Sequence, residues 1–168
     1  MDAMTVIEKL HLQPLTVEGG HFREIYRSTV KTGDGRACDT SIYYLLRRGE
    51  ESCWHRVMAD EIWYYHAGTP VRQTIIDPDG CWRSVVIGAD VANGEIPQSL
   101  IPAGSFQCAH LTGNTDDAWG LFGAAVFPAF TYEDFTGATV EEMRQLFPET
   151  MNEIEKQTFF KTEVNHAG

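Results

Sequence analysis

Short runs of β-branched and aromatic residues, separated by glycine and proline, fill most of the sequence. Between residues 21 and 130 these runs follow one another at regular intervals, and several alternate apolar with polar residues. Short strands with this punctuation are typical of an all-β sandwich or barrel, and the jelly roll is one way to arrange them. We therefore predict an all-β jelly-roll barrel, with strands in HFREIYRSTV, TSIYYLLRRG, SCWHRVM, EIWYYHAG, PVRQTIID, CWRSVVIG, SLIPAGSFQCAHL and AWGLFGAAVFPAF.

Helices are predicted on both sides of this β region. Residues 5–12 can form a short amphipathic helix, which Pro14 interrupts. From Thr139 apolar residues recur at helical spacing, Thr139 and Glu142 form a capping-box pattern, and Pro148 should break the helix. Domains commonly have roughly 100 to 200 residues, so we predict one domain over residues 1–168, with a core at about 14–136 and a C-terminal helical segment at about 138–160.

The charge balance of the chain narrows the classes of partner. Thirteen basic residues stand against 24 acidic ones, for a formal net charge of -11. Nucleic-acid binding depends on cationic surface, so we expect no nucleic-acid partner. No apolar run approaches the roughly 18 residues that cross a bilayer, and no signal-peptide pattern opens the chain. We expect a cytoplasmic protein without a membrane partner, whose four cysteines are reduced.

One stretch, GEESCWHRVMADEIWYYHAG, combines a histidine and a carboxylate at a spacing that suits a shared cavity. Five residues separate Gly49 from His55, five separate His55 from Glu61, and six separate Glu61 from Gly68. Side chains alternate between the two faces of a strand. If the two strands form one hairpin, as we predict, His55 and Glu61 point into the same cavity. This pair is the centre of the candidate site.

The stretch resembles the first motif of the cupin superfamily, in which a glycine, two histidines one residue apart, a glutamate and a closing glycine surround a metal inside a small β-barrel. Val57 replaces the second histidine. Together with VEGGHFREIYRS, TSIYYLL, IPAGSFQCA and FPAFTYEDF, in this order, the chain looks like a member of a small family called cupin type five, which carries a domain-of-unknown-function label. The resemblance implies an RmlC-like jelly-roll barrel, usually a homodimer, with a ligand pocket in the barrel mouth.

The resemblance also covers the second cupin motif, which reads proline, any residue, glycine, two residues and histidine. Here it corresponds to residues 102–107, and Gln107 stands where the third metal histidine would be. Imidazole, carboxylate and amide oxygen are all competent metal ligands. His55, Glu61 and Gln107 are therefore the predicted ligands of a divalent ion, which would be Fe, Mn, Ni or Zn.

The same three residues also suit chemistry without a metal. A histidine beside a carboxylate is a general base with an orienting partner, as proton abstraction next to a carbonyl requires. His55 would be the acid/base, Glu61 would orient it, and Gln107 would polarise a substrate oxygen. The preferred prediction is an isomerase/epimerase or a lyase (dehydratase) that acts on a sugar-like or natural-product-like small molecule. Two alternatives stay open, a metal-dependent cupin oxygenase and a non-catalytic metabolite-binding cupin.

Aromatic residues on the presumed inner faces of the strands are candidates for substrate contact, although such rings are also the ordinary filling of a small barrel. The predicted substrate-binding residues are Trp63, Tyr65, Tyr44 and Tyr26. Strict alternation from Glu61 sends His66 outward, unless a bulge shifts the register. The same alternation places Cys108 and His110 on the face opposite Gln107, in packing or interface positions.

Overall fold

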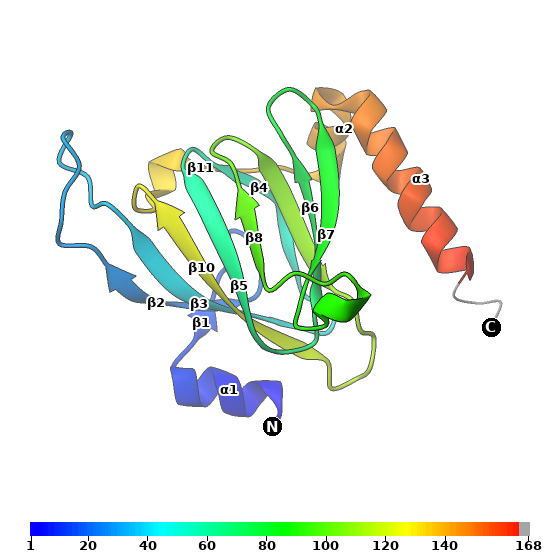
Figure 1. Ribbon diagram of the computed structural model, residues 1–168, viewed down its shortest axis with the longest axis horizontal. Helices are drawn as coiled ribbons and strands as arrows, with labels where there is room; N and C mark the ends of the chain where they lie inside the picture. Colours follow the sequence, from blue (N-terminus) through cyan, green and yellow to red (C-terminus); the bar gives the residue numbers. More distant parts are fainter. Residues whose placement is uncertain (165–168) are drawn as a thin grey trace.

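Two antiparallel sheets packed face to face form the body of the protein (Figure 1). The computed structural model describes residues 1–164, with side chains through residue 157. The first sheet has the strand order β1-β2-β3-β10-β5-β8 and the second β11-β4-β9-β6-β7. The strands are β1 Gln13–Pro14, β2 His21–Arg27, β3 Thr40–Arg47, β4 Glu51–Val57, β5 Asp60–Gly68, β6 Val71–Ile76, β7 Trp82–Ile87, β8 Gln98–Ile101, β9 Phe106–Leu111, β10 Trp119–Phe127 and β11 Phe135–Gly137. The predicted all-β jelly-roll fold is confirmed.

The predicted hairpin between β4 and β5 is wrong, because the two strands belong to different sheets. β4 pairs with β9 and β11, whereas β5 pairs with β10 and β8. The short connection between them is a corner that passes from one sheet to the other. Val57 and Ala59 at this corner pack against Val126 of β10, so the corner is anchored in an apolar cluster instead of standing in solvent as a hairpin turn. His55 and Glu61 therefore come from opposite walls of the sandwich.

Large side chains fill one end of the space between the sheets. Tyr44, Trp63 and Phe122 are at most 1% exposed. The ring centroids of Tyr44 and Trp63 lie 5.2 Å apart, and those of Trp63 and Phe122 lie 5.8 Å apart. Toward the other end, inward positions on the same strands carry smaller side chains, such as Ile42 on β3 and Ala124 on β10. The sandwich is thus solid at one end and hollow at the other.

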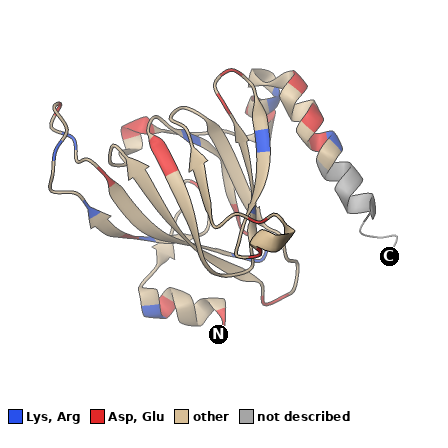
Figure 2. Ribbon diagram, viewed as in Figure 1, with Lys and Arg blue, Asp and Glu red and all other residues tan. Residues whose placement is uncertain are grey.

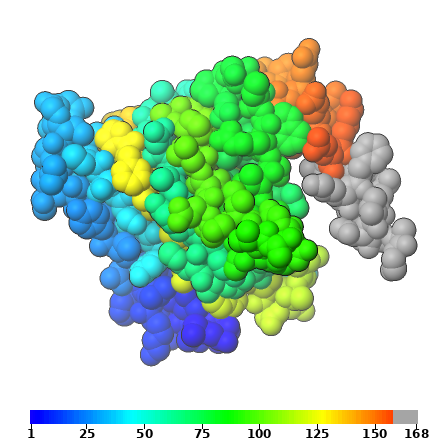
Figure 3. All heavy atoms as spheres, in the orientation of Figure 1, coloured from blue at the N-terminus to red at the C-terminus, as the bar shows by residue number. Residues whose placement is uncertain are grey.

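The helices cover the outer faces of the two sheets. Helix α1 (Ala3–Leu10) packs Val6 against Leu45 of β3. It begins before the predicted residues 5–12, because the Asp2 side chain caps it by accepting a hydrogen bond from the Thr5 amide. Figure 3 shows α1 below the body, the loop between β2 and β3 projecting on one side, and the C-terminal helices on the other.

Helices α2 (Val140–Leu146) and α3 (Pro148–Val164) cover the second sheet, where Met143 and Met151 pack on the outer face. The predicted capping box of Thr139 and Glu142 is present, and Pro148 is the first residue of α3. Proline fits there because the first residues of a helix need no amide donor. Figure 2 shows charged residues gathered along these two helices. No helix among the described residues is long and apolar enough to cross a membrane.

Strand β2 is largely an edge strand. β1 pairs only with its first two residues, His21 and Phe22, and the described residues place no other strand beside the rest of that edge. Ile25 and Tyr26 are 45% and 53% exposed. Edges of this kind can pair with another chain. The homodimer implied by the resemblance stays a prediction.

Candidate functional site

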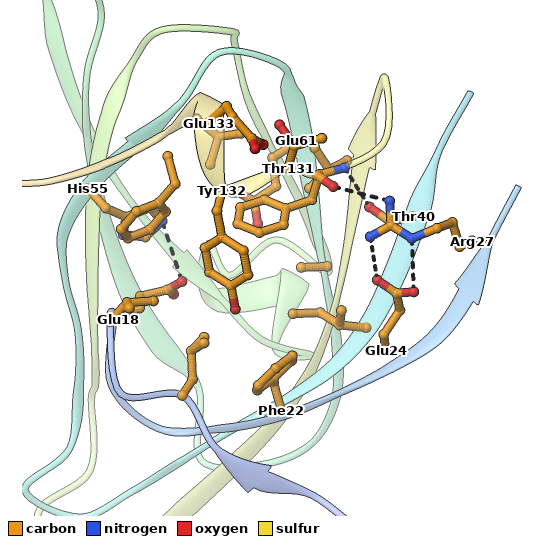
Figure 4. Close-up of a pocket in the computed structure, with 18 residues that line it drawn as sticks. Glu18, Phe22, Glu24, Arg27, Thr40, His55, Glu61, Thr131, Tyr132 and Glu133 are labelled. Atoms are coloured by element: carbon orange, nitrogen blue, oxygen red, sulfur yellow. Dashed lines mark hydrogen bonds and ion pairs between the residues drawn. The ribbon is translucent and has the colours of Figure 1, made fainter. Parts of the chain in front are cut away.

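A cavity of about 340 Å³ occupies the hollow end of the sandwich (Figure 4). Two short segments complete its wall, the loop before β2 and the segment before β11, which contains a 3-10 helix at Tyr132–Asp134. Most of the wall is apolar, with contributions from Leu15, Val17, Phe22, Ile42, Val57, Ala124, Val126, Phe130 and Phe135. The charged and titratable groups that line it are Glu18, Glu24, Arg27, His55, Glu61 and Glu133.

A β-bulge in β4 directs His55 into this cavity. Ser52 pairs with Ala109 of β9 and His55 pairs with Gln107, so β4 has one residue more than its partner between these pairs. Trp54 packs in the cluster beneath the C-terminal helices, whereas His55 lines the cavity and is 2% exposed. The bulge therefore lets Ser52 and His55, which are three residues apart, both face Glu18, whereas strict alternation would place them on opposite faces.

The hydrogen bonding of His55 sets its tautomer. Its Nδ1 lies 2.8 Å from the carbonyl oxygen of Cys53. A carbonyl only accepts hydrogen bonds, so Nδ1 carries the proton and Nε2 of the neutral ring is unprotonated. The ring also stacks on Phe135, with centroids 5.4 Å apart. His55 thus presents a fixed basic nitrogen to the cavity.

Glu18 faces that nitrogen and was not predicted from the sequence. Its Oε2 lies 3.9 Å from His55 Nε2 (Figure 4). Its Oε1 accepts a hydrogen bond of 2.6 Å from the Ser52 hydroxyl. Gly19 has φ of 112°, and a Cβ there would lie 2.1 Å from the carbonyl oxygen of Glu51. Glycine at this position therefore lets the loop approach β4 closely. The glycine pair after Glu18 was the signal that could have identified it.

Glu61, on the opposite wall, is a buried carboxyl group that titrates near neutral pH. It is 8% exposed and accepts hydrogen bonds from Trp63 Nε1 at 3.0 Å and Gln107 Nε2 at 2.5 Å. Burial raises the pKa of Glu61 to about 7, and the nearby charge of Glu18 acts in the same direction, while His55 and the two hydrogen bonds oppose the increase. Near neutral pH this carboxyl group can both hold and release a proton.

A chain of buried hydrogen bonds ends on Glu61. The Ser99 hydroxyl donates to Gln73 Oε1 at 2.6 Å, Gln73 Nε2 donates to Gln107 Oε1 at 2.9 Å, and Gln107 Nε2 donates to Glu61. The oxygen of Gln107 is therefore occupied by Gln73, and Gln107 does not line the cavity. The prediction that Gln107 polarises a substrate oxygen is corrected by this geometry, which makes Gln107 a positioning residue behind Glu61. No sequence signal marked Gln73 or Ser99.

The four aromatic residues predicted to bind substrate lie away from the cavity. Tyr44 and Trp63 belong to the packed end of the sandwich. Tyr65 also packs against that core, and its hydroxyl donates to the carbonyl of Gly68. Tyr26 is exposed beyond a bulge in β2 that follows Glu24. The rings that line the cavity are instead Phe22, Phe130, Tyr132 and Phe135.

The outward positions predicted from alternation are observed. His66 is exposed, and its ring lies edge-on to that of Tyr43, 6.1 Å away. Cys108 packs in the cluster beneath the C-terminal helices, where burial raises the pKa of its thiol to about 12. His110 is exposed on the same strand. None of the three lines the cavity.

The predicted metal ligands do not fit a metal centre. Among the residues that the structure describes, no three His, Cys, Asp or Glu side chains are grouped so that they could hold an ion. Val57 presents an apolar side chain where the cupin motif has a histidine, and the Gln107 oxygen accepts from Gln73. The proposed chemistry below therefore uses no metal.

Comparisons with known proteins agree with this architecture. The family model described as Cupin superfamily (DUF985) matches residues 4–138. A crystal structure of a protein from Shewanella oneidensis is 36% identical, with a TM-score of 0.83 over 93% of this chain and 96% of that chain. An uncharacterized protein of Saccharomyces cerevisiae is 32% identical over 135 residues, which is 71% of this chain and 67% of the yeast protein. Oxalate decarboxylase of Bacillus subtilis, at 19% identity and a TM-score of 0.53 over 82% of this chain and 35% of that chain, is similar in fold alone.

Proposed function

This chain belongs to the DUF985 family of the cupin superfamily. From that premise we propose that its cavity catalyses proton transfer on a small organic molecule, as an isomerase or a dehydratase. One observation carries the proposal. His55, whose Nδ1 is held by the Cys53 carbonyl so that Nε2 is the basic nitrogen of the neutral ring, and a carboxyl group with a pKa of about 7 on Glu61 line the same cavity from opposite walls. Acid/base catalysis is most efficient when the pKa of the catalytic group is near the working pH.

The two groups divide the proton transfer between them. His55 Nε2 removes a proton from a carbon next to a carbonyl group, and the protonated form of Glu61 donates a hydrogen bond to the oxygen on which negative charge develops. Glu18, 3.9 Å from Nε2, stabilises the imidazolium ion that forms. Returning the proton from His55 to a different position or face completes an isomerisation. In a dehydration the imidazolium gives its proton to the departing hydroxyl group, which leaves as water as the carbon–carbon double bond forms.

The wall of the cavity narrows the predicted range of substrates. A sugar-like compound needs a polar partner for most of its hydroxyl groups, since unpaired polar groups are costly to bury. Here half of the lining residues are apolar, and three of the polar ones, Glu24, Arg27 and Glu61, are already hydrogen-bonded to other protein groups. The wall therefore supports a natural-product-like compound with an apolar body and few polar groups.

The His55→Asn variant tests the proposal. The Asn amide can still donate to the Cys53 carbonyl but lacks the basic Nε2, so proton abstraction should fall by roughly 100- to 10,000-fold. Incorporation of deuterium from D₂O into a panel of small carbonyl compounds, followed by NMR, reports this step without knowledge of the natural product. His66→Asn, on the outer face, is the matched control and should exchange like the wild type.

Two outcomes would contradict the proposal. Exchange at the wild-type rate in His55→Asn would exclude His55 as the base. If compounds bind but none of them exchanges with the wild-type protein, the cavity would be a non-catalytic binding site instead.

A further inference from the structure

The cavity carries more acidic than basic side chains. Four glutamates line it, namely Glu18, Glu24, Glu61 and Glu133, against one arginine and one histidine. Even when Glu61 is protonated and Glu24 is paired, the carboxylates of Glu18 and Glu133 remain. A negatively charged ligand would be held close to these like charges, at a cost that water screens only in part.

Each of the three nitrogens of the one arginine in the wall already donates a hydrogen bond to a protein acceptor. Arg27 Nε and Nη2 donate to the two carboxylate oxygens of Glu24 at 3.1 and 2.7 Å, and Nη1 donates to the carbonyl of Phe130 at 3.2 Å. Figure 4 shows this pair on the side of the cavity away from His55 and Glu18. Among the described residues that line the cavity, no further Lys or Arg is left to pair with a phosphate or carboxylate group.

At the opposite side, the Glu18 carboxylate faces Nε2 of His55. Glu18 Oε2 and His55 Nε2 are 3.9 Å apart, which is longer than a hydrogen bond and within the range of an ion pair with a protonated imidazole. The His55 side chain is 3% exposed and lines the cavity. Glu18 Oε2 only accepts hydrogen bonds, so an N–H donor of a ligand can pair with it, whereas a carbonyl or carboxylate oxygen cannot.

Aromatic rings complete the wall between these two sides. Phe22, Phe130 and Tyr132 line the cavity, and the Phe130 and Tyr132 rings contact each other edge to face at 5.2 Å. In Figure 4 Tyr132 lies between the Glu18–His55 side and the Glu24–Arg27 side. Aromatic faces attract organic cations, and the attraction is stronger where water is excluded.

We propose that the cavity selects small organic cations, in which a protonated amine binds Glu18 and an apolar body lies among the aromatic rings. This inference rests on the proposed function only in taking the same cavity as the substrate site. With the ammonium group on Glu18, His55 Nε2 remains free to act on a carbon of the bound molecule. The substrate class is then an amine that also carries a carbonyl group.

Three probes that share one body and differ in charge test the selectivity. Benzylamine, benzyl alcohol and benzoate are titrated into the full-length protein at neutral pH, with affinity measured by calorimetry. We expect benzylamine to bind about tenfold or more tightly than benzyl alcohol, and benzoate to bind most weakly. In Glu18→Gln, which keeps an oxygen for the Ser52 hydroxyl, the preference for benzylamine should fall by about tenfold.

The controls separate this inference from the proposed function. Glu51→Gln removes a carboxylate from β4 outside the cavity and should bind like the wild type. Unchanged affinity of Glu18→Gln for benzyl alcohol shows that the variant folds. The selectivity would be overturned if benzoate bound as tightly as benzylamine or if Glu18→Gln kept the full preference for benzylamine. It would also be overturned if benzylamine did not bind at millimolar concentration. Benzylamine binding with no exchange in any carbonyl compound would overturn only the proposed function.

Discussion

The Val57→His variant is expected to bind one equivalent of zinc or nickel with an affinity roughly 100-fold or more above that of the wild type. Val57 is 6% exposed, lines the cavity, and lies two residues after His55 on the same strand. Side chains at this spacing share one face. The substitution therefore adds a second imidazole beside His55, opposite Glu61, and produces the two-histidine, one-carboxylate donor set that divalent transition metals favour.

The measurement is metal content after treatment with a chelator and reloading, followed by calorimetric titration. Space for the larger side chain comes from the cavity that Val57 lines. The combined variant His55→Asn/Val57→His has lost one imidazole and should lose the gain in affinity. If Val57→His gained nothing, His55 and Glu61 would not converge on a common point, and the acid/base arrangement would lose its geometric basis.

The family pattern located His55 and Glu61 but did not reveal how they are brought together. The spacing between them fits a hairpin as well as a corner between two sheets, because both need only a short connection. The corner is decided by the packing of Val57 and Ala59 against Val126, a residue distant in the sequence. Alternation correctly placed Cys108 outside, since the pairing of β9 with β6 is regular, and His66 is outside as the extra residue of a bulge in β5 between Tyr65 and Ala67.

Residues that act through tertiary contacts could not be identified from local patterns. Glu18 reaches the site because Gly19 lets its loop approach β4 and Gly20 lets it approach β3, and Gln73 reaches Gln107 across paired strands. The aromatic candidates failed for a related reason. Inward-facing positions along one strand serve both ends of the sandwich, and the sequence does not indicate which end is filled.

The Glu61→Gln variant is expected to lose a pH-dependent part of the folding free energy. In the folded protein the pKa of Glu61 is raised from 4.5 to about 7 by burial. The folded state then holds this proton more tightly than the unfolded state. The stabilisation that Glu61 contributes to the folded state is therefore full below pH 4.5, decreases as the pH rises toward 7, and is absent above pH 7. At about 1.4 kcal/mol per pH unit, the wild type should lose on the order of 3 kcal/mol across this interval through Glu61 alone.

Urea unfolding of both proteins at about pH 5 and about pH 8 measures the effect, because groups other than Glu61 titrate in both and cancel in the comparison. The amide of the variant can be accommodated, since the side-chain amides of Gln107 and Gln73 can each rotate and the Ser99 hydroxyl can accept instead of donate. Stability should therefore change less with pH in Glu61→Gln, and the exposed Glu51→Gln should behave like the wild type. An identical pH dependence in Glu61→Gln and the wild type would mean that Glu61 ionises as it does in water, and such a group could not serve as the acid near neutral pH.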